Sequence, residues 1–139
     1  MKSQFSEAVW KGIEGHIQPL GCTGVEILDV RPGYSLLQME INDTNVNIYG
    51  FAHGGILYTL CDSASGMATY AFGKTNVTLS SSMSYMKSAT KGLIQAECNV
   101  IHKGRKTAVS TVNIFNEDND LLATATFTMY LKADVDPKE

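Results

Sequence analysis

The segment from His53 to Phe72 constrains the fold more than any other part of this 139-residue chain. The segment is long and apolar, and Asp62 is its only charge before Lys74. A helix that faces water carries Lys and Glu on its outer side, so a helix with almost none is expected to be covered by protein on both sides. A carboxylate is costly to bury in such surroundings, which makes Asp62 a candidate for chemistry.

Length and composition limit the classes of protein that fit. The chain has the size of one domain, and we expect a single domain over 1–139 with a frayed tail over 132–139. The 11 basic and 14 acidic residues give no surface for a polyanion, so a nucleic-acid partner is not expected. Three widely separated cysteines fit neither a disulfide framework nor a zinc ribbon. With no signal peptide and no run long enough for a membrane span, we expect a soluble, cytoplasmic protein.

Hydrophobic periodicity predicts an α+β architecture. A single sheet needs a cover on its apolar face, and the 53–72 helix is the only long apolar element that could supply it. We therefore expect that helix to be wrapped by one curved antiparallel sheet. In the last strand the odd positions are apolar, and a period of two places them on the core face. We expect helices over 3–17 and 53–72, and strands over 25–30, 34–41, 77–86, 93–102, 107–115 and 121–131.

The two sides of the long helix have different compositions. At about 100° per residue, Asp62 lies opposite the arc that is expected to pack on the sheet. Its neighbours there are small or uncharged, which suits a contact with another subunit, although an exposed aspartate on a weakly polar face is the plainer alternative. The neighbours are Tyr58, Ser65, Gly66 and Thr69. The packed arc comprises Ile56, Leu57, Leu60, Cys61, Ala64, Met67, Ala68, Ala71 and Phe72.

The helix begins at His53-Gly54-Gly55, where the first N–H groups have no partner within the helix and face the positive end of its dipole. Such a terminus can bind an anion or stabilise an oxyanion, whereas the plainer alternative is a flexible joint with His53 as a cap. Gly54 and Asp62 are separated by about 12 Å of helix rise, too far to act on one carbonyl. If both are catalytic, Asp62 must work with Gly54 of a second copy across a two-fold axis.

The pattern Asn47-x-x-Gly50-x-x-His53-Gly54-Gly55 followed by Asp62 resembles the hotdog-fold acyl-CoA thioesterases. The resemblance is strongest to the branch with phenylacetic-acid-degradation thioesterases and thioesterase superfamily member 2, and it runs from the first helix to the last strand. It implies a long helix inside a curved sheet, a dimer with one continuous sheet, and commonly a homotetramer. It also implies an acyl-CoA substrate that is hydrolysed to free acid and coenzyme A, with no cofactor and no metal.

The resemblance assigns roles by position. It implies that the Gly54 N–H and the Asn47 side chain polarise the thioester carbonyl, and that His53 lies near the leaving sulfur. Asp62 of the partner subunit would act as general base or nucleophile, and Thr78 stands where relatives use a serine to position water. The basic residues among the implied coenzyme A contacts have solvated turns as their plainer alternative. The implied substrate contacts are Gly55, Ser80, Tyr85, Met86, Lys87, Ser88, Ala89, Thr90, Lys103, Gly104, Arg105, Lys106, Thr107 and Ala108.

Three alternatives stay open at this point. A hotdog hydratase or dehydratase would share the fold but usually pairs a catalytic histidine with a carboxylate in other motifs. A non-catalytic acyl-CoA-binding protein would need only the pocket. A cysteine nucleophile would have to be Cys61, which lies on the sheet-facing arc and is expected to be core. The three histidines, His16, His53 and His102, lack metal-ligand spacing.

Overall fold

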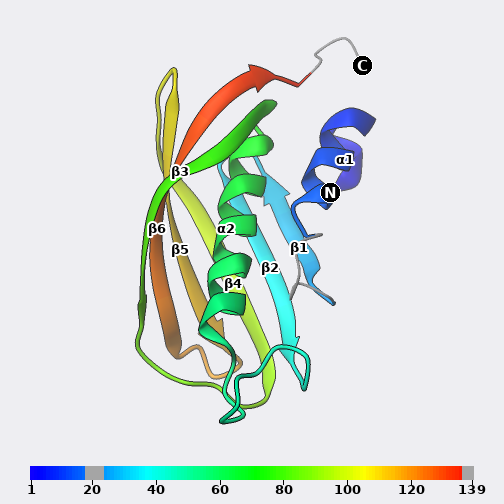
Figure 1. Cartoon of the computed structure of the whole chain (residues 1–139). Helices are drawn as coiled ribbons and strands as arrows, with labels where there is room; N and C mark the ends of the chain where they lie inside the picture. Colours follow the sequence, from blue (N-terminus) through cyan, green and yellow to red (C-terminus); the bar gives the residue numbers. More distant parts are fainter. Residues whose placement is uncertain (18–23, 136–139) are drawn as a thin grey trace.

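The computed structural model describes residues 1–17 and 24–135 of the chain. Cys22, one of the three cysteines, and the last four residues of the expected frayed tail fall outside this range. Figure 1 shows the elements in chain order. They are η1 (Lys2–Gln4), α1 (Glu7–Gly15), β1 (Glu26–Arg31), β2 (Tyr34–Ile41), α2 (Gly54–Tyr70), β3 (Lys74–Tyr85), β4 (Gly92–Lys103), β5 (Thr107–Asn116) and β6 (Leu121–Asp134).

The six strands form one antiparallel sheet that curves around α2 (Figure 1). The strand order is β1-β2-β4-β5-β6-β3, so β1 and β3 are the two edges. Helix α2 contacts all six strands, and α1 packs on α2. The predicted α+β architecture, a long helix wrapped by a curved sheet, is confirmed. Among the described residues, no helix is both long and apolar enough to span a membrane.

The strands predicted over 25–30 and 34–41 are confirmed and form a hairpin whose turn also contacts the helix. Arg31 pairs with Tyr34 across Pro32-Gly33, and Gly33 has φ 83°, a conformation that favours glycine. The Gly33 N–H donates to the Ala68 carbonyl at 3.0 Å. The turn therefore supplies a donor to one of the last carbonyls of α2, which lack partners within the helix.

Two predicted boundaries differ from the structure. The N-terminal helix begins at Glu7 rather than at Ser3, because the Ser6 hydroxyl accepts from the Val9 N–H at 3.2 Å and caps the helix there. The last strand continues to Asp134, so the prediction of a frayed tail is wrong for 132–134. These residues are ordered because Asp134 pairs with Lys74 at the start of β3, through the strand ladder and an ion pair.

The inward pattern of β6 holds from Ala123 to Leu131, where the odd positions are buried. It fails at the start of the strand, where Leu121 is exposed and Leu122 is buried instead. The register shifts opposite Phe115, so that β6 has one residue more than β5 there. A bulge of this kind moves the following side chains to the other face, and no feature of the β6 sequence signals it.

The sheet-facing arc of α2 is confirmed, but the prediction for its opposite face is wrong in part. This chain alone buries Ser65, Gly66 and Thr69, so no second subunit is needed to cover them. The Ser65 hydroxyl bonds to that of Ser110 on β5 at 2.5 Å, and His16, the residue that follows α1, covers Gly66. The curvature of the sheet and the position of α1 enclose this face. Of the residues expected there, Asp62 and Tyr58 remain accessible.

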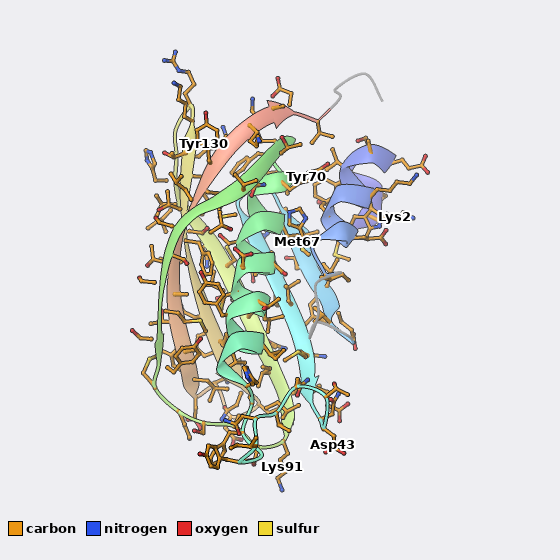
Figure 2. All side chains as sticks on the ribbon, in the orientation of Figure 1. Lys2, Asp43, Met67, Tyr70, Lys91 and Tyr130 are labelled. Carbon is orange, nitrogen blue, oxygen red and sulfur yellow. The ribbon has the colours of Figure 1, made fainter. Side chains whose placement is uncertain are left out.

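Helices α1 and α2 approach each other closely at two glycines. A Cβ on Gly12 of α1 would lie 2.1 Å from the Tyr70 ring, and one on Gly66 of α2 would lie 2.7 Å from the His16 ring. Each helix therefore supplies a glycine against which the other places an aromatic side chain. Figure 2 shows Tyr70 on the side of α2 that faces α1.

We predict that Gly12→Ala destabilises the fold, because the new methyl group would overlap the Tyr70 ring. Overpacking of this kind costs about 1–3 kcal/mol. Gly15→Ala on the same helix is the matched control, since a Cβ there would meet nothing within 4 Å. The control should gain up to about 1 kcal/mol from helix propensity. Urea unfolding of both variants measures the difference, and equal stabilities would show that the ring moves aside at no cost.

Candidate active site

A first cavity of about 240 Å³ opens at the N-terminus of α2. It contains Asn47, Gly54 and the segment 85–89 after β3, three features that the sequence analysis placed in the site from separate motifs. The structure brings them together because the 85–89 segment crosses the start of the helix, where the Ala52 N–H donates to the Ala89 carbonyl at 2.8 Å. Four further residues line this cavity and were not predicted: Phe51, Ala52, Leu57 and Leu122.

The amide of Asn47 has a fixed orientation. Its Oδ1 accepts from the backbone N–H groups of Tyr49 at 2.9 Å and Phe51 at 3.1 Å. Both partners are donors, so this atom must be the oxygen and the other must be the NH₂ group. Among the described residues, the NH₂ group has no hydrogen-bond partner. The loop thus holds Asn47 as a hydrogen-bond donor at the first cavity.

The first turn of α2 offers a second donor at the same cavity. The Gly54 N–H has no partner within the described part of the chain, and it lies at the positive end of the helix dipole. The Tyr85 hydroxyl donates to the Gly54 carbonyl at 2.8 Å and so ties β3 to the helix start. His53 is the N-cap: its Nδ1 accepts from the Gly55 N–H at 2.9 Å, which leaves the proton on the exposed Nε2. His53 itself does not line the cavity.

Asp62 lies in a second cavity, of about 280 Å³, between α2 and β3. The Thr78 hydroxyl donates to Asp62 Oδ1, so the structure brings together the two residues that the resemblance paired. His16 and Asn76 line the same cavity and were missed. Gly66, four residues after Asp62 on one face of α2, was the sequence signal that could have found them, because a glycine permits close approach from another element.

The two cavities share no lining residue, and Gly54 and Asp62 lie in different ones. The separation predicted from the helix rise is therefore seen in the fold. Gly55, Ser80 and Thr90, all expected at the substrate, line neither of these two cavities.

Within one chain, the basic residues of the β4–β5 turn lie far from the first cavity. Residues 103–106 form the β4–β5 turn, at the opposite end of the sheet from the loop that precedes α2 (Figure 1). Lys103 Nζ lies 5.2 Å from the centre of the Phe72 ring, just beyond the C-terminus of α2. Lys87 lines the first cavity and pairs with Asp120 at 2.5 Å in an exposed ion pair, which contributes little stability and leaves the lysine able to take another anion. That ion pair also lowers the pKa of Asp120.

Cysteine and metal chemistry find no support in the described residues. Cys61 is fully buried, and burial raises the pKa of its thiol, which suits a core residue and not a nucleophile. Burial raises the pKa of Cys98 to about 12. Within 1–17 and 24–135 there is no group of three or more His, Cys, Asp or Glu side chains that could hold a metal ion.

Comparison with known proteins places the chain in a family. A profile of the thioesterase superfamily matches residues 49–123. A putative esterase of Archaeoglobus fulgidus is 31% identical over 130 residues, which cover 93% of this chain and 84% of that protein. A hypothetical thioesterase of Streptococcus pneumoniae, solved with coenzyme A, is 32% identical with a TM-score of 0.84, and the match covers 89% of this chain and 97% of that chain.

Zebrafish thioesterase superfamily member 2 is 27% identical with a TM-score of 0.80, and the match covers 88% of this chain and 94% of that chain. It represents the branch that the sequence motif resembles, so the predicted branch is confirmed. The chain therefore belongs to the thioesterase superfamily, and it is a thioester hydrolase with the hotdog fold.

Proposed function

We propose that this enzyme hydrolyses acyl-CoA thioesters to free acid and coenzyme A, at active sites shared between two copies of the chain. The observation that carries the proposal is the division of polar groups between the two cavities. Asn47 and Gly54 offer hydrogen-bond donors in the first, and Asp62 offers a carboxylate in the second. The pneumococcal thioesterase that binds coenzyme A supports the choice of substrate.

The first cavity would bind the thioester carbonyl. Its oxygen would accept from the Gly54 N–H and from the Asn47 NH₂ group. Neither donor has a partner in the described part of the chain, and neighbouring hydrogen bonds fix both in place. The oxygen gains negative charge when the carbonyl carbon is attacked, and donors that are already oriented stabilise that charge without reorganisation. The helix dipole acts in the same direction. His53 would lie at the mouth of this cavity, near the leaving sulfur.

Asp62 of the second copy would act as the general base. It would take a proton from water, the water oxygen would bond to the carbonyl carbon, and the C–S bond would then break to release the thiolate of coenzyme A. Thr78 holds one carboxylate oxygen and leaves the other for the water. The pneumococcal relative has been solved with an Asp→Ala and with a Thr→Ala substitution, at positions 16 apart, which is also the separation of Asp62 and Thr78. Direct attack by Asp62 as a nucleophile is the alternative within the same geometry.

The edge strand β3 supports a homodimer. It has no charged residue after Lys74, and its apolar side chains Val77 and Leu79 are 49% and 60% exposed. Edge strands that stay unpaired are usually protected by charges, so an uncharged one favours pairing with another strand. Pairing β3 with its copy across a two-fold axis would form one continuous sheet and set two α2 helices antiparallel. Asp62 would then approach the second copy's Gly54.

The same pairing accounts for the distant basic turn. An antiparallel arrangement reverses the second copy, so its Lys103, Arg105 and Lys106 lie at the same end of the dimer as this chain's first cavity. Together with Lys87 they would bind the phosphates of coenzyme A. We further propose that dimers pair into a homotetramer and that the enzyme works in the cytoplasm. No cofactor is needed, because every proposed group belongs to the protein.

A hydratase remains the second candidate, because His16 and Asp62 share one cavity and a hydratase commonly pairs a histidine with a carboxylate. A panel of acyl-CoA thioesters of short, medium and long chain, with phenylacetyl, hydroxybenzoyl and crotonyl groups, separates the two activities. We expect release of free thiol, unchanged by a chelator. Loss of the crotonyl double bond without thiol release would instead identify a hydratase. Binding with neither reaction would identify a non-catalytic acyl-CoA-binding protein.

Two substitutions test the halves of the site. Asp62→Asn keeps the volume but removes the basic oxygen, and should lower kcat by about 100- to 10,000-fold. Asn47→Asp keeps the oxygen that binds the loop but removes the NH₂ donor, and should lower kcat by about 100- to 1000-fold with little change in KM. An effect confined to KM would make Asn47 a binding residue only.

Mixing the two inactive variants tests the shared site. A mixed dimer places both lesions in one site and leaves the other intact, so activity should return to a fraction of the wild-type value. If each site belonged to one chain, mixing would recover nothing. Copurification of differently tagged chains must first show that subunits exchange. A mixture without activity then means that the site is not shared.

The dimer edge is tested by Leu79→Lys. A charge at this exposed position of β3 should oppose strand pairing, giving a monomer by light scattering and a loss of turnover. Ile101→Lys is the matched control, because Ile101 is an exposed apolar residue, 63% accessible, on the inner strand β4. The control should keep the wild-type assembly and its activity. An active Leu79→Lys variant with the wild-type assembly would place the dimer contact elsewhere.

A further inference from the structure

His16 presents to the second cavity one ring nitrogen that has no hydrogen-bond partner within residues 1–17 and 24–135. Its Nδ1 lies 2.6 Å from the Gly12 carbonyl oxygen. A carbonyl can only accept, so Nδ1 must carry the proton and Nε2 must present a lone pair. The Cδ2–Nε2 edge of the ring lies against Gly66 of α2, where a Cβ would be 3.0 Å from Nε2.

Asn76 presents a second acceptor at the same place. Its Nδ2 donates to the carbonyls of Gly66 at 3.2 Å and Lys74 at 3.4 Å, which fixes the amide orientation. Its Oδ1 is buried and has no hydrogen-bond partner in the described part of the chain. This oxygen lies 3.8 Å from the same Cβ position on Gly66. A buried acceptor without a donor is costly, and it commonly indicates a bound water.

Asp62 supplies the third hydrogen-bond acceptor at the second cavity. It precedes Gly66 by one helical turn on the same face of α2, and side chains with that spacing have Cβ atoms about 5–6 Å apart. Thr78 already donates to Oδ1. The second carboxylate oxygen has two lone pairs, so it can accept from a cavity water as well as from the attacking water. The cavity therefore combines three acceptors with the hydroxyl of Ser63, which can donate or accept. Its volume of about 280 Å³ has room for several waters, each of which needs about 30 Å³.

We propose that ordered water in this cavity links Asp62 to His16, and that His16 Nε2 receives the proton that Asp62 withdraws from the attacking water. The inference rests on the proposed function of Asp62. The protonated carboxyl gives its proton to a cavity water, and that water gives one of its own to Nε2. The resulting imidazolium, which is partly exposed, releases a proton to solvent. The carboxylate and the neutral imidazole are both restored. His16 is thus a positioning residue and proton acceptor that acts through water and does not touch the substrate.

The surroundings of His16 suit this role. Burial lowers its pKa, against the opposing effects of the Gly12 hydrogen bond and the Asp62 charge, so the imidazole is neutral at neutral pH and can accept. Among the described residues, α2 brings Asp62 and Tyr70 to it, with the Tyr70 ring edge-on at 5.4 Å. Strand β3 contributes the uncharged Asn76, and Lys74 is paired with Asp134.

The test uses His16→Gln and His16→Ala, with Tyr70→Phe and His102→Gln as controls for packing and for loss of a histidine elsewhere. Glutamine can hold a water but cannot take a proton. We expect His16→Gln to lower kcat by about 10- to 100-fold, with KM within twofold. This loss is below the roughly 100- to 10,000-fold of direct general acid–base catalysis, because His16 acts through water. The active imidazole is the neutral form, so wild-type turnover should be lost as the pH falls through the lowered pKa of His16. The turnover of the His16→Gln variant should not show this loss at low pH.

Rescue distinguishes a proton acceptor from a packing residue. His16→Ala should recover turnover when imidazole is added, and substituted imidazoles should restore it in the order of their pKa values. Wild-type kcat in His16→Gln would overturn the inference. So would equal losses in His16→Gln, His16→Ala and Tyr70→Phe that follow thermal stability and resist imidazole. Asp62→Asn is assayed in parallel: if it stays active, the proposed function fails, whereas an inactive Asp62→Asn beside a normal His16→Gln removes only this inference.

Discussion

The enclosure of α2 determines where chemistry can occur in this molecule. One sheet curves around the helix and α1 closes most of the remaining side, so ten of its residues are buried. Water and substrate can reach the helix at its N-terminus and along its seam with β3. The two cavities lie at those places, with Gly54 in one and Asp62 in the other. The same enclosure explains why a helix with a single charge is stable, because the carboxylate lies at the seam and not in the core.

Hydrogen bonds around each polar side chain decide what that side chain can offer. Among the residues that the structure describes, the oxygen of Asn47 is bonded and its NH₂ group has no partner, whereas the NH₂ group of Asn76 is bonded and its oxygen has no partner. His53, which does not line the first cavity, exposes an N–H, whereas His16 presents a lone pair to the second cavity. Asn47 and Gly54 therefore supply donors to the first cavity, and His16, Asn76 and Asp62 supply acceptors to the second. A carbonyl that gains negative charge matches the first, and a water that loses a proton matches the second.

The sequence predicts the fold and part of the site because both depend on local patterns. Three patterns are readable without coordinates: the period of two in β6, the Pro32-Gly33 dipeptide, and the long apolar segment with a single charge. The motif around Gly54 likewise indicates the family. Features that depend on contacts between distant parts of the chain were not predicted. They are the bulge opposite Phe115, the closure of the Ser65 face by β5, and the approach of His16 to Asp62. In each case the deciding partner lies on another element. Gly66 indicates a close approach to α2 near Asp62 but does not identify His16 as the partner.

The donors Asn47 and Gly54 lie in one cavity and the carboxylate of Asp62 lies in the other, and this separation has an evolutionary consequence. Under the proposed shared site, a duplicated gene could lose Asp62 in one copy and the donor Asn47 in the other. Their heterodimer would still contain one complete site, while neither homodimer would contain any. Obligate partnership between the two products could therefore arise from two loss-of-function changes, without any new contact. A fold that separates its reactive groups in this way is predisposed to become a two-gene enzyme.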